Sequence, residues 1–218
     1  MTMPDPSDPP DITILHIDDG LVVVRKPAGL LSVPGRGPDR ADCVVTRVQQ
    51  RVPDALVVHR LDMATSGLLL MARGLQAQRL LSAAFAERRV TKRYVAVVAG
   101  LPAEDCGEVA LPLVCDWPNR PRQMVDHARG KPALTRWRVL SRHAQDGTTR
   151  LELEPVTGRS HQLRVHLQSI GHPILGDALY APPHWQRASP RLLLHACQLA
   201  VVHPVSGEAL AFSDPADF

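Results

Sequence analysis

Polar and ionisable residues of this sequence gather in three short clusters. The first runs from His59 to Gly67, the second from Lys92 to Tyr94, and the third from Gly158 to His166. Each cluster lies beside an apolar run of the kind that forms buried strands or helix faces. The pattern predicts that polar side chains meet where strands end, which is a common place for a site.

Asp62 is the acid of the first cluster. It lies between Leu61 and Met63 and shortly before the apolar run Leu68 to Met71, so we expect a partly buried carboxylate that needs hydrogen bonds or a cationic partner. A carboxylate of this kind can attack carbon or accept a proton. A turn or cap residue is the alternative that the local sequence leaves open.

The third cluster predicts a helix that carries Arg159 and Arg164. These arginines can hold a carboxylate or meet phosphate, and the helix N-terminus also favours anions, although an ordinary basic helix has the same composition. His161 and His166 are five residues apart, which does not place them on one helix face. We expect no metal site, and the sequence has no GxSxG, GxxxxGK[ST] or GxGxxG motif.

The charge of the chain favours an anionic partner. The formal net charge is +3, but five acids lie within the first nineteen residues, and the remainder carries a net charge of about +8. Only Lys26, Lys92 and Lys131 are lysines among the 25 basic residues. Arginine suits phosphate, although a GC-rich genome accounts for the arginine content equally well.

Two stretches concentrate this positive charge. The first holds Arg88, Arg89, Lys92 and Arg93, and the second runs from Trp117 to Arg142 with seven basic residues and one acid. Pro118, Pro121 and Gly130 interrupt the second stretch, which therefore predicts loops that bear cations. A solvated surface is the alternative in both cases.

The expected fold is α+β, with a mixed, largely antiparallel sheet and flanking helices. Residues 1–11 are expected to form a flexible tail, and residues 12–218 one domain. Apolar patterns predict strands over 12–17, 21–24, 67–72, 94–99, 151–154 and 192–202, and helices over 42–52 and 75–86. A third helix should begin with Ser160 as its cap and end at Gly171.

The sequence has no apolar run of about 18 residues and no signal peptide at its start. We therefore expect a cytoplasmic protein with no membrane partner. The four cysteines are scattered without a CxxC pair, which argues against a zinc or redox site.

The three clusters closely resemble motifs of the RluA family of pseudouridine synthases. The family signature HRLD followed by TSG corresponds to His59 to Asp62 and Thr65 to Gly67, and further similarity covers 23–30, 92–96, 158–166 and 171–177. The resemblance covers nearly everything after residue 12. Stretches such as Cys115 to Pro121 (CDWPNRP) are similar to the small dual-specificity members of the family.

The resemblance implies a catalytic domain without the S4-type RNA-binding module that several relatives carry. It implies that Asp62 is the catalytic aspartate, that Arg164 is its ion-pair partner, and that Tyr94 stacks on the target base. It further implies that Leu163 forms an apolar wall, that Arg60 fills the base stack or positions the flipped nucleotide, and that His59 helps to bind substrate. We expect RNA contacts from Arg88, Arg89, Lys92, Arg93, Arg120 and Arg122.

The implied reaction isomerises uridine in a tRNA anticodon stem-loop and a 23S ribosomal RNA hairpin. The N1 to C1' bond breaks, the uracil turns, and C5 joins C1'. No cofactor or metal is expected, because no atoms or electrons are exchanged with another molecule, and we expect a monomer with no protein partner. Whether Asp62 attacks the sugar, attacks the base or acts as a base stays open.

Two other functions are compatible with parts of the sequence. A non-catalytic RNA-binding protein would use the basic surface alone, and the presence of Asp62, Tyr94 and Arg164 argues against it. A nucleoside or glycoside hydrolase would need a second acid beside Asp62, and the sequence shows no obvious one.

Overall fold

The computed structural model describes residues 12–37 and 40–218. The tail expected over residues 1–11 lies outside the described residues. Within the described part, no helix has the length and apolar character needed to cross a membrane.

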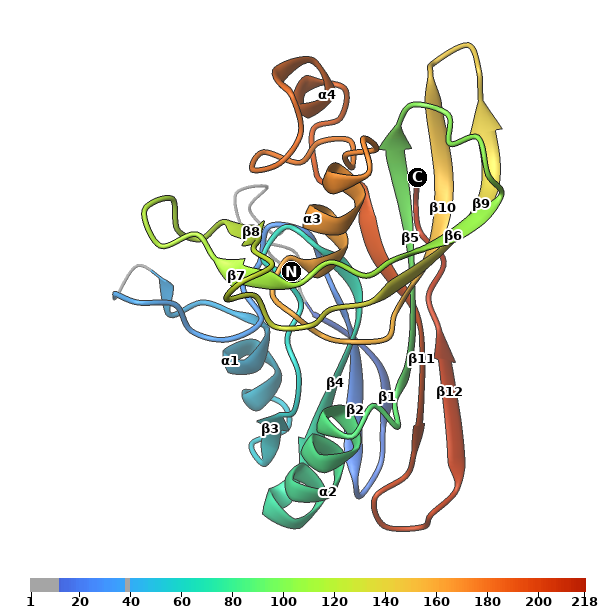
Figure 1. The fold of residues 1–218 in the computed structure, drawn as a ribbon. Helices are drawn as coiled ribbons and strands as arrows, with labels where there is room; N and C mark the ends of the chain where they lie inside the picture. The colour runs from blue at the N-terminus through green and yellow to red at the C-terminus, as the bar shows by residue number, and fades with distance from the viewer. Residues whose placement is uncertain (1–11, 38–39) are drawn as a thin grey trace, which may run out of the picture.

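A long twisted sheet forms the centre of the molecule (Figure 1). Within the described residues ten strands belong to it, and its main path runs β1-β2-β4-β11-β5-β10-β9-β6, with β3 paired to β4 and β12 paired to β11. The strands are β1 (Thr13–Ile17), β2 (Leu21–Lys26), β3 (Ala55–Val57), β4 (Ser66–Arg73), β5 (Thr91–Ala99), β6 (Cys106–Val109), β9 (Thr135–His143), β10 (Thr148–Pro155), β11 (Leu194–Val202) and β12 (Ala209–Ser213). Among these pairs only β4 with β11 is parallel, so the expected mixed, largely antiparallel sheet is confirmed.

Helices cover both faces of the sheet. The helices α1 (Val44–Gln49) and α3 (Gln162–Ser169) lie on one side together with a small hairpin of β7 (Leu113–Cys115) and β8 (Gln123–Val125), as Figure 1 shows. Helix α2 (Gly74–Ala86) packs on Leu68 and Leu70 of β4, whereas α1 packs on Leu69 and Met71. Successive side chains of β4 point to opposite faces of the sheet, so this strand contributes to two separate apolar cores. The short helix α4 (Pro183–Arg187) has no buried residue.

Helix α3 fixes the end of the sheet where the candidate site lies. Leu163 and Leu167 of α3 pack on Ala96 and Val98 of β5 and on Leu151 of β10. Full burial of a leucine side chain contributes about 1.5 to 3 kcal/mol, so these contacts hold α3 firmly against β5 and β10.

Two sequence-based expectations are wrong. The stretch from Trp117 to Arg142 is not all loop, because Thr135–His143 forms β9, whose exposed Arg136 and Arg138 face Glu108 and Glu152. Ser160 does not cap α3. His161 occupies the cap position in a left-handed conformation, with φ 52°, and makes no side-chain cap bond.

Gly67 allows the parallel strands β4 and β11 to approach each other. Its φ is +110°, and a Cβ at this position would lie 2.6 Å from the backbone nitrogen of Ala196. No other residue type combines this conformation with this contact at low cost. The glycine of the TSG motif is therefore a requirement of the sheet.

We predict that Gly67→Ala lowers the free energy of unfolding by at least about 3 kcal/mol, since it adds backbone strain and a clash with β11. Urea unfolding measures the change. Gly147→Ala is the matched control: Gly147 also has a positive φ, of 62°, but nothing lies within 4 Å of the added Cβ, so we expect a loss of only about 1 kcal/mol. Equal losses in the two variants would show that the close approach to Ala196 has no cost.

Candidate active site

The loop that carries Asp62 connects β3 to β4 and is held by backbone hydrogen bonds. Ser32 bonds both polar groups of Leu61: its Oγ donates to the carbonyl at 2.7 Å and accepts from the N–H at 3.1 Å. The N–H of Gly29 donates to the carbonyl of Met63 at 2.9 Å, and the N–H of Thr65 donates to that of Asp62 at 3.1 Å. The position of Asp62 is therefore fixed on both sides.

Lys26 is the strongest support of this loop. Its side chain is fully buried, and its Nζ donates to the carbonyls of Pro27, Met63 and Thr65 at 2.9, 2.9 and 2.7 Å. Burial lowers the pKa of Lys26 to about 7, and the nearby charge of Asp62 acts in the opposite direction. Three acceptors match the three N–H donors of an ammonium group, so we assign Lys26 the charged form.

The Asp62 carboxylate is partly buried, as expected, with 27% of its side chain exposed. Both cationic or polar neighbours face the same oxygen, Oδ2: Nη1 of Arg164 lies 3.4 Å away and Nε2 of His161 lies 3.9 Å away. No described residue forms a hydrogen bond or ion pair with Oδ1. One oxygen is thus held, and the other is available to a substrate.

Arg164 does pair with Asp62, but its tighter partner is Asp177. Nε and Nη2 of Arg164 donate to Asp177 at 2.8 and 2.7 Å, and both side chains are almost completely buried. Asp177 is a second acid near Asp62, which the sequence analysis did not find. Because it also accepts the N–H groups of Leu179 and Tyr180, it has no free oxygen for acid or base chemistry.

Tyr94 and Leu163 belong to the same apolar cluster between β5 and α3, and their roles as stacking ring and apolar wall stay predictions. Tyr94 belongs to the same face of β5 as Ala96, which packs against Leu163 of α3. Burial raises the pKa of the Tyr94 hydroxyl well above its usual value, and the negative charge of Asp62 raises it further. Tyr94 is therefore neutral and can act as a stacking surface with a hydroxyl group that donates.

Arg60 and His59 differ sharply in their surroundings. The Arg60 side chain is exposed, and no described residue forms a hydrogen bond or ion pair with it, so it is available to RNA. The His59 ring instead stacks on Phe85 of α2 at 4.4 Å, and its Nε2 accepts the N–H of Leu70 at 3.0 Å. Burial lowers the pKa of His59 to about 3. These contacts give His59 a structural role, and its expected contact with substrate stays a prediction.

The basic residues expected to bind RNA lie on different sides of the molecule. Arg93 points to the face of β5 opposite Tyr94 and pairs with Glu152 at 2.6 Å, so it lies on the other face of the sheet, and its contact with RNA stays a prediction. Lys92 alternates with Arg93 and shares the face of Tyr94. Arg88 and Arg89 are exposed near the end of α2, where Arg89 pairs with Glu87.

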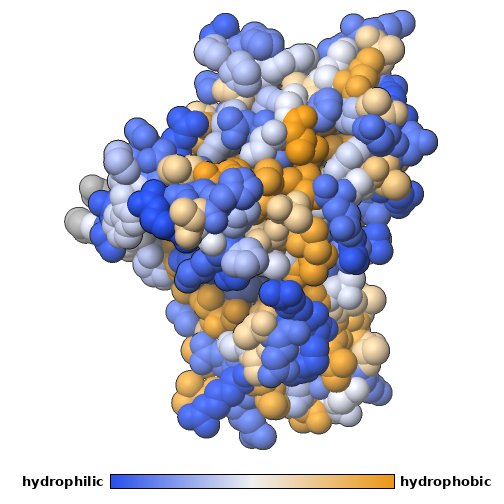
Figure 2. All heavy atoms as spheres, viewed as in Figure 1, coloured by the Kyte–Doolittle hydropathy of each residue, from blue (hydrophilic) through white to orange (hydrophobic). Residues whose placement is uncertain are grey.

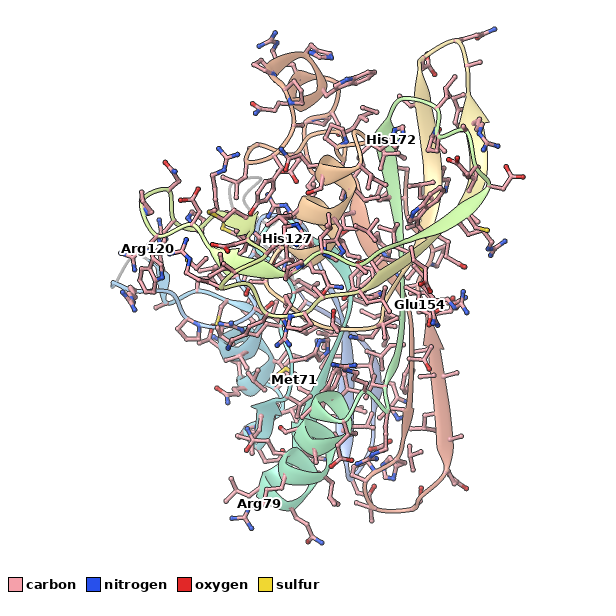
Figure 3. All side chains as sticks on the ribbon, in the orientation of Figure 1. Met71, Arg79, Arg120, His127, Glu154 and His172 are labelled. Carbon is pink, nitrogen blue, oxygen red and sulfur yellow. The ribbon has the colours of Figure 1, made fainter. Side chains whose placement is uncertain are left out.

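Arg120 and Arg122 belong to the β7–β8 hairpin, and the Arg122 guanidinium lies 5.5 Å from the centre of the Tyr180 ring. Figure 3 shows Arg120 at the end of this hairpin, on the opposite side of the view from Glu154 of the β10 surface. In the same orientation, hydrophilic side chains cover much of the surface around the hairpin (Figure 2). The Arg120 guanidinium lies over the ring of Trp117, 4.6 Å from its centroid, and 66% of Trp117 is exposed.

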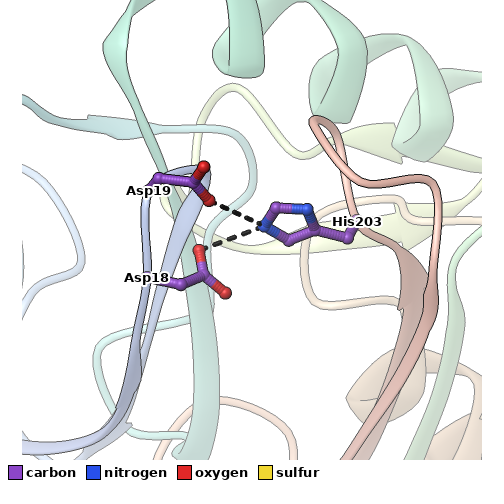
Figure 4. Close-up of side chains that lie close together, drawn as sticks. All are labelled: Asp18, Asp19 and His203. Carbon is purple, nitrogen blue, oxygen red and sulfur yellow. Dashed lines mark hydrogen bonds and ion pairs between the residues drawn. The ribbon is translucent and has the colours of Figure 1, made fainter.

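Asp18, Asp19 and His203 form a separate cluster where two hairpins meet (Figure 4). Nε2 of His203 lies 3.1 Å from Asp18 and 3.6 Å from Asp19. Nδ1 of His203 accepts the N–H of Ser206 at 2.9 Å, so Nε2 carries the proton and donates to Asp18. A metal ligand needs a nitrogen without a proton, and the cluster is therefore a structural contact between hairpins.

Comparison with known proteins agrees with this arrangement. Residues 20–169 match the family described as RNA pseudouridylate synthase. The chain belongs to the RNA pseudouridylate synthase family. It is accordingly an isomerase that acts on RNA.

Relatives of known function cover the whole length of this pseudouridine synthase. It is 52% identical over 213 residues to the dual-specificity RNA pseudouridine synthase RluA of Escherichia coli (strain K12), with 98% of this chain and 97% of that protein covered. The RluA of Pasteurella multocida (strain Pm70) is 53% identical with the same coverage. The structure of human RNA pseudouridylate synthase domain containing 1 has a TM-score of 0.78 and 29% identity, covering 97% of this chain and 86% of that one.

Sequence reasoning missed four residues of the site: Lys26, His161, Asp177 and Tyr180. Lys26 and Asp177 lie in stretches that resemble the family, but nothing in their local sequence indicates that one supports Asp62 and the other Arg164. His161 was considered only as a metal ligand. Tyr180, whose hydroxyl lies 2.7 Å from Nδ1 of His161, has no signal beyond being one of only two tyrosines in the chain.

We predict that Lys26→Met lowers the free energy of unfolding by about 3 kcal/mol, because three buried carbonyls lose their donor. The turnover rate should fall as well, since the Asp62 loop loses its support. Urea unfolding and a turnover assay measure the two effects. Lys131→Met, at an exposed lysine, should change stability by less than about 0.5 kcal/mol. A Lys26→Met protein as stable as the wild type would contradict this role.

Proposed function

We propose that this pseudouridine synthase isomerises uridines in both a tRNA anticodon stem-loop and a 23S ribosomal RNA hairpin, with Asp62 as the catalytic residue. The observation that carries the proposal is the Asp62 carboxylate, with one oxygen held by Arg164, the other free, and Tyr94 beside it. The dual substrate is supported by the relatives named dual-specificity RluA, which match over almost their full length.

The proposed chemistry uses the free oxygen of Asp62. The carboxylate acts on the uridine while the N1 to C1' bond breaks, the uracil turns within the pocket, and C5 bonds to C1'. C5 then loses its proton and N1 gains one. Substrate and product have the same atoms and oxidation state. The reaction therefore needs no cofactor, and the proposal includes none.

The walls of the site suit a base that has left its stack. Tyr94 offers an aromatic face, and Leu163 offers an apolar one that is 94% buried within the protein. Arg60, exposed two residues before Asp62, can enter the space that the flipped uridine leaves. Extrusion of a base costs a few kcal/mol, which contacts with phosphate offset.

The β7–β8 hairpin is the proposed RNA-binding surface of this site. Trp117 and Arg120 form an exposed stacked pair, and the adjacent Arg122 adds a second cation. An aromatic ring and guanidinium groups on a projecting hairpin suit the unpaired bases and phosphates of an RNA loop. Ribosomal and transfer RNA lie in the cytoplasm, so we propose that the protein works there, as a monomer.

We predict that Asp62→Asn abolishes turnover, by at least about 10⁴-fold, on short stem-loops that represent both substrates. Tritium release from RNA labelled at uridine C5 measures turnover. RNA affinity, measured by filter binding, should change less than about threefold because phosphate contacts dominate it. Substantial release by the variant would refute the catalytic role of Asp62. Wild-type release from only one stem-loop would refute the dual substrate.

We predict that Arg120→Ala and Trp117→Ala each weaken RNA binding by about tenfold, as expected for the loss of a phosphate contact or a stacked base. Trp117→Phe should retain most of the affinity because it keeps a ring. Arg138→Ala is the matched control: this exposed arginine pairs with Glu152 on the other face of the sheet, and its loss should leave binding unchanged. Equal effects of Arg120→Ala and Arg138→Ala would place the RNA elsewhere.

A further inference from the structure

Tyr180 and His161 make a chain of contacts that ends at Asp62. The hydroxyl of Tyr180 accepts the N–H of Gln123 at 2.7 Å and lies 2.7 Å from Nδ1 of His161. Nε2 at the other end of the imidazole ring faces Oδ2 of Asp62 at 3.9 Å. Only 5% of Tyr180 is exposed, so these contacts lie away from bulk water.

The hydrogen bonds of Tyr180 determine where the proton of His161 lies. A buried hydroxyl must donate its own proton as well as accept one. Gln123 donates to it, and among the described residues Nδ1 of His161 is the acceptor within reach. The hydroxyl therefore donates to Nδ1, and the imidazole proton is on Nε2, the nitrogen that faces Asp62. Burial lowers the pKa of His161, which favours this neutral form.

The backbone of His161 is strained to give the ring this direction. Its φ of 52° and ψ of 17° lie in the left-handed region, at the first position before α3. The side chain makes no capping hydrogen bond with the helix, so helix capping does not account for this conformation. Strain of this kind costs about 1 kcal/mol or more and persists where surrounding contacts require it. In this conformation the His161 ring contacts Tyr180 at one nitrogen and faces Asp62 with the other.

We propose that His161 is a positioning residue for Asp62, and that Tyr180 holds it as a neutral donor directed at Oδ2. Together with Arg164, which reaches the same oxygen at 3.4 Å, this donor restricts rotation of the carboxylate and leaves Oδ1 directed to the substrate. A shift of less than about 1 Å turns the 3.9 Å contact into a hydrogen bond. The inference rests on the proposed function, because it assumes that Asp62 does the chemistry.

Tyr180 also connects this donor to the proposed RNA-binding hairpin. Gln123, which donates to the Tyr180 hydroxyl, is the first residue of β8, and the Arg122 guanidinium lies 5.5 Å from the centre of the Tyr180 ring. Arg164 lies over the same ring at 5.0 Å. A movement of the hairpin on RNA binding can therefore move Tyr180, and through it both His161 and Arg164, which face Asp62.

The first test compares three variants of His161 in the tritium-release assay. His161→Leu should lower kcat by about 10- to 100-fold with KM within about twofold, because substrate binding does not depend on the donor. Gln places an amide nitrogen near the position of Nε2, whereas Asn reaches only the position of Nδ1. His161→Gln should thus recover part of the lost kcat, and His161→Asn should not. His143→Leu, at an exposed histidine of β9, is the control and should match the wild type.

The second test removes only the hydroxyl group of Tyr180. Tyr180→Phe keeps the ring, and we expect about a tenfold lower kcat. In the double variant with His161→Leu the losses should not add, since Tyr180 is proposed to act through His161. Additive losses, or full kcat in either single variant with normal unfolding, would overturn the inference. If His161→Leu does not fold, Tyr180→Phe alone decides it. An inactive wild-type protein would instead refute the proposed function.

Discussion

The buried guanidinium of Arg164 is the constraint on which the site depends. Moving a cation out of water costs several kcal/mol unless carboxylates compensate it closely. Asp177 does so with two hydrogen bonds, and it is itself fixed by the N–H groups of Leu179 and Tyr180. The charge of Arg164 is thus balanced by Asp177, whereas its third nitrogen, Nη1, faces Oδ2 of Asp62. The longer, 3.4 Å contact with Asp62 can therefore orient the proposed catalytic carboxylate without covering it.

The two acids of the site, Asp62 and Asp177, differ in how many hydrogen bonds their carboxylates accept. A carboxylate that accepts four hydrogen bonds, as Asp177 does, has little capacity left for chemistry. Asp62 receives its support through the backbone of its loop instead, from Lys26 and Ser32. Support through the backbone fixes the position of a side chain but leaves its oxygens unoccupied. The two acids therefore differ in their environment and not in their residue type: Asp62 is proposed to react, whereas Asp177 holds Arg164.

Much of the fold could be predicted because its apolar periodicity is local. The buried runs of β2, β4, β5 and β11 and the helical spacing in α2 appear directly in the sequence. Charge content was misleading over residues 117–142, because β9 alternates Arg136 and Arg138 with buried Thr135 and Trp137. The number of cations in a stretch does not reveal that exposed and buried residues alternate along it, as they do in a strand. The left-handed His161 could not be predicted either, since its contacts come from Asp62 and Tyr180.

The residues of the site, like the elements of the fold, could be predicted only in part. Resemblance and charge rules predicted Asp62 and Arg164 as site residues, but they did not predict Asp177. It lies 115 positions after Asp62 and approaches it only through the tertiary fold. The Lys92, Arg93 and Tyr94 motif illustrates the geometric reason. Successive strand residues point to opposite faces, so Tyr94 reaches the site while Arg93 pairs with Glu152 behind it. A contiguous motif on a strand therefore cannot act as one unit: at most every second residue can touch the substrate, and the remainder must serve the opposite face.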